Sequence, residues 1–419
     1  MTISVGDSGF DVAVVGGGII GLSVALTLQS EGKRVCLMEA GDVGRGASWG
    51  NAGHLATEQI DPIADVGVLK KLPKMLLDPL GPLRLDWRYL PQLTPWMIRL
   101  LLNLRPKAFA NTCAALIALN SHSLPAWLRL VQRWDLGAYV HTHGSYLVCE
   151  QAASVATVQA HGARLQQRGV DNEWVDQAPL LAALPALASN QLGGLFFPET
   201  GHVTDLPAIL ARLTAAFTGL GGTVMTCCEV VDARQGPEGV VLKSKQDHVV
   251  QAAEVVVACG AYSKPLVKQL LNLSVPLDTE RGYHLMLPQA QGLLPVPVSS
   301  ADRRFIMTPM DAGLRLAGTV EFAGLDAAPN MARAQNLHAL AQPMLRAPLD
   351  LADSSDWMGF RPSFPDSLPV IDRVGRVTLA FGHQHLGLTQ AALTAELVSQ
   401  LMHDRTPTIP LTPFRINRF

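Results

Sequence analysis

The sequence predicts an α/β fold of two domains, in which a parallel sheet is combined with a second, antiparallel sheet. Near the N-terminus an apolar strand runs straight into a glycine-rich turn and a helix, which is how a βαβ unit begins. Farther along, residues 283–287, 305–308 and 314–318 have the composition of antiparallel strands. The length of 419 residues exceeds what one hydrophobic core usually supports, so two domains are expected.

The glycine-rich turn carries the pattern Gly-x-Gly-x-x-Gly, with a strand at residues 12–15 before it and a helix at residues 22–29 after it. Gly16 permits the tight turn, Gly18 lets the backbone approach a pyrophosphate, and Gly21 lets the helix pack closely on the sheet. The unpaired N–H groups at the start of the helix, with a partial positive charge of roughly +0.5, favour an anion. We therefore expect a dinucleotide site at Val15, Gly16, Gly17, Gly18, Ile19, Ile20 and Gly21.

An acidic residue supports the dinucleotide interpretation. Glu39 directly follows the apolar residues 35–38, which form the next strand. In dinucleotide-binding βαβ units an acid about twenty residues after the glycines accepts hydrogen bonds from ribose hydroxyls. A turn without a ligand would need glycine but not this acid, so we expect Glu39 to hold a ribose.

The composition excludes several functional classes. Lys and Arg number 33 against 35 Asp and Glu, so the net charge of −2 offers no basic field for nucleic acid. Hydrophobic residues at 48% and charged residues at 16% exclude a disordered chain. The six cysteines lack Cys-x-x-Cys spacing, which favours reduced core thiols, and the sequence shows no secretory signal and no membrane span. A cytoplasmic location is expected.

Residues 66–104 combine many apolar side chains with Lys and Arg, and five prolines divide them into short pieces. This composition favours helices packed on their own domain or on a partner subunit. It also fits a peripheral contact with the inner face of the membrane, so both interpretations stay open.

Helices and strands alternate through the middle of the chain and return to the first domain at its end. Helices are expected at residues 110–134, 155–168 and 206–217. Strands are expected at residues 139–149, 193–198, 222–231, 255–258 and 377–381.

The C-terminal part adds a second anion-binding turn and a candidate substrate anchor. Residues 382–389 form a glycine-bracketed turn that opens a helix, whose N–H groups suit negative charge such as that of a reduced cofactor ring. Arg361 follows Gly-Phe and precedes Pro, and a guanidinium pairs with a carboxylate bidentately. An ion pair with Asp366 is the structural alternative for Arg361, while Arg303 and Arg304 are competing anchors.

Five motifs, taken in order, resemble the D-amino-acid oxidase family of FAD enzymes. They are Gly-x-Gly-x-x-Gly with Glu39, Ser48-Trp49-Gly50-Asn51-Ala52-Gly53, Val257-Ala258-x-Gly260-x-x-Ser263, Gly-x-Arg361-Pro, and the Gly382-His383 turn. The likeness covers essentially the whole chain. The second motif and residues 66–104 most resemble D-amino-acid dehydrogenase-type and D-hydroxyproline dehydrogenase-type members.

The resemblance implies a Rossmann-like FAD-binding domain that is discontinuous in sequence, and an α+β substrate domain whose antiparallel sheet covers the flavin. The FAD-binding domain is expected at residues 1–60, 200–272 and 352–419, and the substrate domain at 61–199 and 273–351. FAD is expected to be noncovalent, because His54 does not match a covalent attachment motif.

The resemblance also implies roles for individual residues. The glycine turn would hold the pyrophosphate, Val230 would contact the adenine region through its backbone, and Gly260 would pass close to the cofactor. The flavin ring would be lined by Ser48, Asn51, Ala52 and Gly53, and its pyrimidine end by Gly382, His383, Gly387, Leu388 and Thr389. Gln384 stands where many family members have glycine, which places a harder demand on the backbone.

The implied reaction is hydride transfer from the substrate Cα to flavin N5, which gives an imino acid that water hydrolyses to a 2-oxo acid and ammonia. Arg361 would bind the substrate carboxylate, and Tyr283 or His284 would orient the substrate, while Tyr283 fits the role of an ordinary aromatic core residue equally well. No side-chain general base is required. The implied substrates are D-amino acids or cyclic and secondary imino acids such as D-proline and hydroxy-D-proline, with a quinone or carrier as electron acceptor.

Two other functions stay open. One is an oxidase that reduces oxygen and acts on secondary amines such as glycine, sarcosine or opine-like compounds, and the other is a flavin-carrying subunit of a multisubunit dehydrogenase. His141-x-His143 and His383-x-His385 have the spacing of two metal ligands, but the sequence supplies no third ligand beside them, so no metal site is expected.

Overall fold

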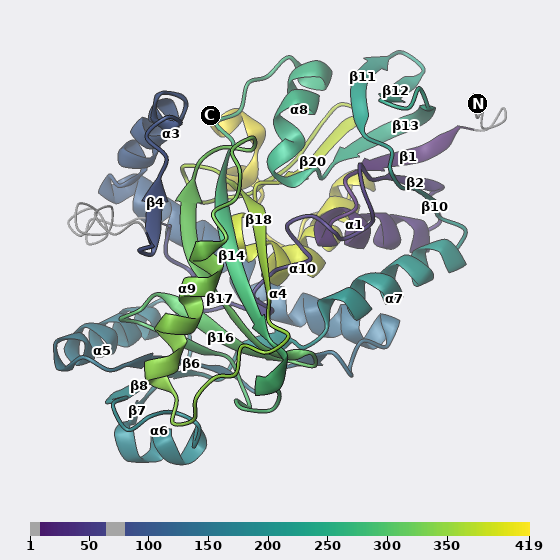
Figure 1. Ribbon diagram of the computed structural model, residues 1–419. Helices are drawn as coiled ribbons and strands as arrows, with labels where there is room; N and C mark the ends of the chain where they lie inside the picture. Colours follow the sequence, from purple (N-terminus) through teal and green to yellow (C-terminus); the bar gives the residue numbers. More distant parts are fainter. Residues whose placement is uncertain (1–8, 64–79) are drawn as a thin grey trace.

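The first large sheet of the computed structural model, which describes residues 9–63 and 80–419, joins the two ends of the chain (Figure 1). Its strand order is β10-β2-β1-β13-β12-β11, and β20 pairs with β13 and β19. β1 pairs in parallel with β2 and β13, and β13 pairs in parallel with β20. The strands are β1 (Phe10–Val15), β2 (Val35–Met38), β10 (Thr223–Met225), β11 (Val230–Gly236), β12 (Gly239–Ser244), β13 (Val249–Val257), β19 (Val370–Val374) and β20 (Val377–Phe381).

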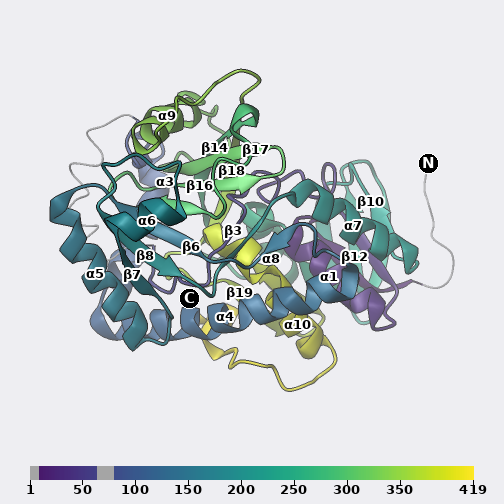
Figure 2. The same ribbon diagram turned by 90° about the horizontal axis from the view of Figure 1, so that it is seen from below.

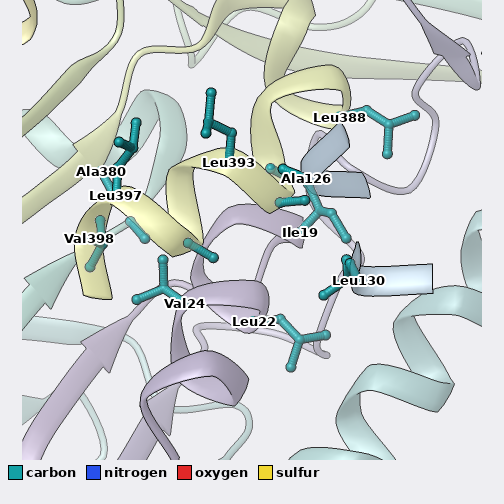
Figure 3. Close-up of a cluster of buried hydrophobic side chains, with 14 of the residues drawn as sticks. Ile19, Leu22, Val24, Ala126, Leu130, Ala380, Leu388, Leu393, Leu397 and Val398 are labelled. Carbon is teal, nitrogen blue, oxygen red and sulfur yellow. The ribbon is translucent and has the colours of Figure 1, made fainter. Parts of the chain in front are cut away.

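Helices cover both faces of this sheet, which explains why its central strands are apolar throughout. On one face, α1 (Ile19–Ser30), α4 (Pro106–Trp134), α7 (Leu206–Gly219) and α10 (Gly387–Met402) share a buried cluster. Figure 3 shows Ile19 and Leu22 of α1 in this cluster with Ala126 of α4 and Leu393 of α10. On the other face lies α8 (Ser263–Leu271). α4 runs along one side of the molecule and packs on α10 (Figure 2).

The second large sheet has the order β18-β14-β17-β16-β15-β6-β8-β7, with β4 beside β17. Its pairs are antiparallel except β15 with β6 and β17 with β4, so the expected antiparallel sheet is present with two parallel additions. The strands are β4 (Leu83–Leu85), β6 (Ser145–Cys149), β7 (Glu173–Asp176), β8 (Gly193–Phe197), β14 (Asp278–Leu287), β15 (Val298–Ser300), β16 (Phe305–Met310), β17 (Gly313–Phe322) and β18 (Ser355–Ser363).

The two faces of the second sheet differ in chemistry. α9 (Ala332–Ala341) lies across β14 and β17 and covers a face that carries Leu285, Leu316 and other apolar side chains (Figure 1). The opposite face carries the side chains of Glu280, His284 and Arg361, because side chains alternate along β14 and β18. This polar face turns toward the first sheet and forms one wall of the candidate site.

A small third sheet and further helices complete the described chain. Its strands β3 (His54–Leu55), β9 (Gly201–Val203) and β5 (Val140–His141) are antiparallel. α5 (Ala152–Gln167) and α6 (Gln177–Ala183) pack beside β8. α3 (Leu90–Asn103) is anchored by Trp96, whose ring lies 5.2 Å from that of Phe322.

Several expected boundaries differ from the structure. Residues 222–231 do not form one strand, because Cys227 adopts φ of +50° and separates β10 from β11. Cys227 is exposed, whereas the other five cysteines are buried or half-buried, and all six are free thiols. β18 pairs with β14, so residues 355–363 join the second sheet, although the expected boundary at residue 352 assigns them to the first domain. Residues 66–79 of the apolar, basic segment lie outside the described residues.

Candidate active site

The glycine turn between β1 and α1 leaves no side chain between its backbone and a ligand. Gly16 has φ of +106°, and a Cβ there would overlap the carbonyl oxygen of Ala258. A Cβ on Gly21 would overlap the carbonyl oxygen of Gly16, so the helix can pack this closely only with glycine. A Cβ on Gly18 would lie 3.2 Å from the Ser48 hydroxyl and meet nothing else within 4 Å. Gly18 therefore borders the space that a ligand would fill.

The start of α1 supplies hydrogen-bond donors to that space. The first backbone donor inside the helix is Leu22 N–H, which donates to the Gly18 carbonyl at 2.9 Å. Ile19 N–H donates to the Ser48 hydroxyl at 3.0 Å, so this loop serine already satisfies one helix-end amide. A helix end with outward amides and no side chain in front of it fits the pyrophosphate of FAD.

Glu39 lies beside the glycine turn, as the sequence predicts. Its Oε2 accepts from Gly17 N–H at 2.6 Å and its Oε1 from Gly41 N–H at 3.0 Å. A carboxylate has about four lone-pair sites, so it can still accept from ribose hydroxyls. The backbone carbonyl of Glu39 accepts from Cys228 N–H at 2.8 Å, which brings the chain leading to Val230 alongside.

Val230 and Gly260 lie in the neighbourhood that the sequence predicts for them. Val230 opens β11 where the register with β12 shifts, two residues after the segment bonded to Glu39. Gly260 has φ of +54°, and a Cβ there would meet nothing within 4 Å, so it faces open space after β13. The carboxyl ends of β1, β2 and β13 thus surround one site, where doubly wound sheets bind ligands.

The expected flavin loop, residues 48–53, packs directly beneath the polar face of the second sheet. A Cβ on Gly50 would overlap the ring of Trp357. A Cβ on Gly53, where φ is +79°, would lie 2.9 Å from the Val203 carbonyl oxygen and 3.1 Å from the Met310 sulfur. The glycines of this loop are required because the loop is held between two layers.

Two side chains of the sheet hold the flavin loop in place. His284 Nδ1 donates to the Gly50 carbonyl at 2.9 Å, and the His284 ring stacks on Trp357 with centroids 5.2 Å apart. Arg315 Nη1 donates to the Asn51 carbonyl at 2.5 Å. Burial lowers the pKa of His284 to about 3, and the positive charge of Arg315 contributes to that shift. His284 is therefore neutral and its Nδ1 is engaged by the loop, and its role in orienting the substrate stays a prediction.

Arg361 lies on the same face as His284, over Gly282. A Cβ on Gly282 would overlap the guanidinium, so this glycine makes room for Arg361. Burial lowers the pKa of Arg361, while nearby Glu280 works in the opposite direction. Within the described part of the chain no carboxylate lies at ion-pair distance from Arg361, and its Nη1 donates only a long bond of 3.4 Å to the Thr319 carbonyl.

The alternative roles considered for the basic residues are resolved by their partners. Asp366 pairs with Arg418 at 2.7 Å and not with Arg361. Arg303 pairs with Glu150 at 2.8 Å, away from the polar face of β14 and β18. Arg361 thus remains the candidate anchor on that face.

Tyr283 lies on the other face of the sheet, which corrects the expectation that it orients the substrate. Its hydroxyl donates to Glu321 Oε2 at 2.5 Å and accepts from Asn330 N–H at 3.2 Å. The side chain is 1% exposed and packs near Arg333 under α9. Because successive residues of a strand point to opposite faces, His284 and Tyr283 cannot both reach the site.

The turn at residues 382–389 borders the site from the first domain. Gly382 has φ of +85° and Gln384 φ of +52°, so Gln384 adopts the left-handed conformation that glycine would take more easily. Thr389 Oγ1 accepts from Ala56 N–H at 2.9 Å, which ties the start of α10 to the chain after the flavin loop. His383 Nε2 lies 3.0 Å from Thr394 Oγ1 inside the domain.

Sequence reasoning missed four residues of this region: Glu280, Arg315, Trp357 and His385. Alternation along β14 places Glu280 on the same face as His284. Glu280 could therefore have been predicted from the sequence once His284 was assigned to the face of the site. Arg315 and Trp357 come from strands whose partners are distant in sequence. His385 was noticed only for its spacing from His383, and the proximity to Arg361 that the structure reveals depends on the tertiary fold.

The buried imidazole of His383 predicts a pH-dependent stability. Burial lowers its pKa to about 3, against about 6.5 in the unfolded chain, so acid protonates the unfolded state first and stability is lost as the pH falls below 6.5. Replacing His383 with glutamine removes this contribution. We expect the loss of unfolding free energy between pH 7 and pH 5 to be about 2 kcal/mol smaller in His383→Gln than in wild type.

Urea unfolding of both FAD-loaded proteins at pH 7 and pH 5 measures this difference. Other buried groups titrate in both proteins, including His54, whose pKa is lowered to about 4, and Glu58, whose pKa is raised to about 7. Their contributions cancel in the comparison. Equal pH dependence of the two proteins would contradict the assignment.

Among residues 9–63 and 80–419, no group of three or more His, Cys, Asp or Glu side chains is arranged to hold a metal ion. None of the helices in the same residues has the length and apolar composition needed to cross a bilayer.

Comparison with known proteins identifies the family. The model of the DAO family, described as FAD dependent oxidoreductase, matches residues 11–401. A D-amino-acid oxidase of Bradyrhizobium diazoefficiens is 33% identical over 98% of this chain and 99% of its own length. A D-amino acid dehydrogenase of Vibrio vulnificus is 29% identical over 93% of this chain and 95% of its own length.

Solved structures show the same fold. Glycine oxidase from Geobacillus kaustophilus superposes with a TM-score of 0.75 at 22% identity, covering 98% of this chain and 99% of the other. L-proline dehydrogenase from P. horikoshii superposes with a TM-score of 0.71 at 16% identity, covering 98% of this chain and 98% of the other. The resemblance seen in the sequence and the expected fold class are confirmed, and FAD is the cofactor that the family requires. The chain belongs to the DAO family of FAD-dependent oxidoreductases.

Proposed function

We propose that this enzyme oxidises the Cα–N bond of D-amino acids or of cyclic imino acids such as D-proline and hydroxy-D-proline. The observation that carries the proposal is Arg361, a half-buried guanidinium on the wall of the site with no carboxylate at ion-pair distance within the described residues. A partly desolvated cation is stabilised by a carboxylate, and a substrate carboxylate would accept from it bidentately. Relatives of 33% and 29% identity that are named D-amino-acid oxidase and D-amino acid dehydrogenase support the D configuration.

Each group of the site has a part in this function. Arg361 binds the substrate carboxylate, while His284 and Arg315 hold the flavin loop against the sheet. The glycine turn, Glu39 and the start of α10 hold the cofactor, which when bound would accept the hydride from the substrate Cα. No side-chain general base is assigned.

We propose that FAD is held noncovalently. His54 follows the flavin loop, but its ring is buried with Nε2 3.8 Å from Glu58 Oε2, and its backbone lies in β3 beside His202. Denaturation followed by filtration tests this assignment. Flavin that passes the filter supports it, and flavin that stays with the protein overturns it.

The visible spectrum of the FAD-loaded protein tests the function under anaerobic conditions. D-alanine, D-proline, cis-4-hydroxy-D-proline and sarcosine are added separately, with L-alanine and L-proline as controls. Bleaching of the flavin band by a D-compound supports the proposal. Bleaching only by sarcosine supports a secondary-amine oxidase, and an absence of bleaching with every amine until a second protein is added supports a flavin-carrying subunit.

The electron acceptor is proposed to be a quinone or a protein carrier. Turnover in air separates this proposal from an oxidase. Fast reduction of a soluble quinone with slow release of peroxide supports a dehydrogenase, whereas stoichiometric oxygen uptake and peroxide release overturn it.

We propose that α3 rests on an anionic lipid surface, where a membrane quinone would be within reach. Its outward side carries Ile98, Leu101 and Leu102, which are 53%, 50% and 44% exposed, with the exposed Arg99 beside them. Residues 87–107, which comprise α3 and the start of α4, contain four Lys or Arg and neither Asp nor Glu, which complements acidic headgroups.

Co-sedimentation with vesicles tests this contact. We expect binding to phosphatidylglycerol-containing vesicles that weakens with salt and is lost in Ile98→Glu/Leu101→Glu, while phosphatidylcholine vesicles bind weakly. Leu273→Glu, which replaces an exposed leucine after α8, serves as the control. Binding that is equal for the variant and wild type would overturn the lipid proposal, and a concentration-dependent dimer lost in the same variant would instead indicate subunit packing.

A further inference from the structure

His385 is a histidine of the site that the reaction scheme has not used. It lies in the turn before α10, and its Nε2 is 2.7 Å from Gln59 Oε1. Its surroundings desolvate the ring, which lowers its pKa to about 4, and the charge of Arg361 adds to this shift. The ring is nevertheless partly exposed, whereas Gln384 and Leu386 on either side are buried. The turn that carries His385 lies against β18, the strand that carries Arg361, so the two side chains belong to neighbouring elements.

The Gln59 side chain determines which nitrogen of His385 carries the proton. The amide oxygen of Gln59 faces His385 and can only accept a hydrogen bond, so Nε2 of His385 carries the hydrogen. In the neutral ring Nδ1 is left as an acceptor.

Gln59 is itself held in position by the core. Asn120 Nδ2 donates to the backbone carbonyl of Gln59 at 2.8 Å, and Gln390 Nε2 donates to Asn120 Oδ1 at 3.0 Å. Asn120 and Gln390 are buried. These bonds link α4, the segment after the flavin loop and α10, and they hold the backbone of Gln59 beside His385.

The unprotonated Nδ1 has no hydrogen-bond partner among residues 9–63 and 80–419. We propose that His385 Nδ1 accepts a hydrogen bond from the N–H of the amino or imino group of the substrate whose carboxylate binds Arg361. The inference rests on the proposed function and deepens it. Arg361 offers only donors and neutral His385 offers an acceptor, so the two side chains recognise the two ends of an α-amino acid by opposite chemistry.

Two substitutions of His385 separate this role from a structural one. Asparagine places an amide oxygen near the position of Nδ1 and so keeps the acceptor. Glutamine extends its amide to the position of Nε2, so it can replace the contact with Gln59 but offers no acceptor at the position of Nδ1. We expect His385→Gln to lose about 10- to 100-fold in kcat/KM for D-proline or D-alanine, with His385→Asn within about threefold of wild type. His338→Asn, on α9 away from the site, is the matched control.

Kinetics of the holoenzymes with equal flavin content decide the outcome. Wild-type values in His385→Gln, or equal losses in the glutamine and asparagine variants, would overturn the assignment of Nδ1. Because wild type is measured first, an absence of flavin reduction by any D-amino acid rejects the proposed function. Reduction of wild type with unchanged variants rejects only the role of His385.

Gln59 provides a second test that leaves His385 in place. In Gln59→Glu a carboxylate accepts from Nε2–H and favours the imidazolium, which raises the pKa of His385. A protonated Nδ1 cannot accept a hydrogen bond, so kcat/KM decreases as the pH is lowered. We expect the midpoint of this decrease to lie about one pH unit or more higher in Gln59→Glu than in wild type. The shift should vanish in Gln59→Glu/His385→Asn. Superimposable pH profiles of Gln59→Glu and wild type would contradict the inference even if His385→Gln fails to fold.

Discussion

Replacing Arg361 with glutamine lowers kcat/KM for D-amino acids by about 10²- to 10³-fold, which corresponds to roughly 3–4 kcal/mol. The guanidinium is half-buried on the sheet above Gly282, and nothing else described on that face replaces its charge at the same place. The loss should fall on KM and kcat together, because a carboxylate that is not held also misplaces the Cα.

Substrate analogues show whether the loss reflects the carboxylate. An amide such as D-alaninamide has no carboxylate, so wild type and Arg361→Gln should oxidise it at similar, low rates. Arg361→Lys keeps the charge but not the two parallel donors, so its kcat/KM for D-alanine should lie between those of wild type and Arg361→Gln. Anaerobic flavin reduction in stopped flow measures all three. Unchanged discrimination between D-alanine and its amide in Arg361→Gln, at full flavin content, would remove Arg361 as the anchor.

Replacing Gly18 with valine abolishes FAD binding while the protein still folds. A Cβ at Gly18 meets only the Ser48 hydroxyl at 3.2 Å, so the added methyl groups enter the space in front of α1 where the pyrophosphate belongs. At Gly16 and Gly21 a Cβ would strike backbone instead, and a loss of flavin there would not separate binding from folding. Gly18 is therefore the informative position.

The ratio of flavin to protein absorbance and the circular dichroism spectrum measure this effect. Gly18→Val should be colourless with a wild-type far-ultraviolet spectrum, and it should stay colourless when excess FAD is added. Gly137→Ala is the control, because a Cβ there meets nothing within 4 Å. A yellow Gly18→Val protein with full occupancy would overturn the pyrophosphate assignment.

The nucleotide site could be predicted from the sequence because it is built from a local pattern. The glycines, the strand before them and Glu39 lie within thirty residues of one another, and the βαβ geometry follows from that spacing. The structure adds only contacts across the sheet, such as that between Gly16 and Ala258.

The substrate wall could be predicted only in part. Arg361 was found because its chemistry suits a carboxylate, but Tyr283 was placed on the wrong side because one sequence does not reveal which face of a strand is covered. α9, which covers the Tyr283 face, follows β14 by more than forty residues. Arg315 and His385 gain their places through strand register and tertiary contact, which local patterns do not encode.

The parallel pairing of β13 with both β1 and β20 has a consequence for how the enzyme is made. The residues of the glycine turn that receives FAD are synthesised early. Their helix α1 nevertheless packs on α10, which begins at Gly387. A ribosome must therefore release almost the entire polypeptide before the nucleotide pocket is complete. Nascent chains stalled before that helix should emerge without flavin, and cellular supply of FAD should stabilise only finished molecules against proteolysis.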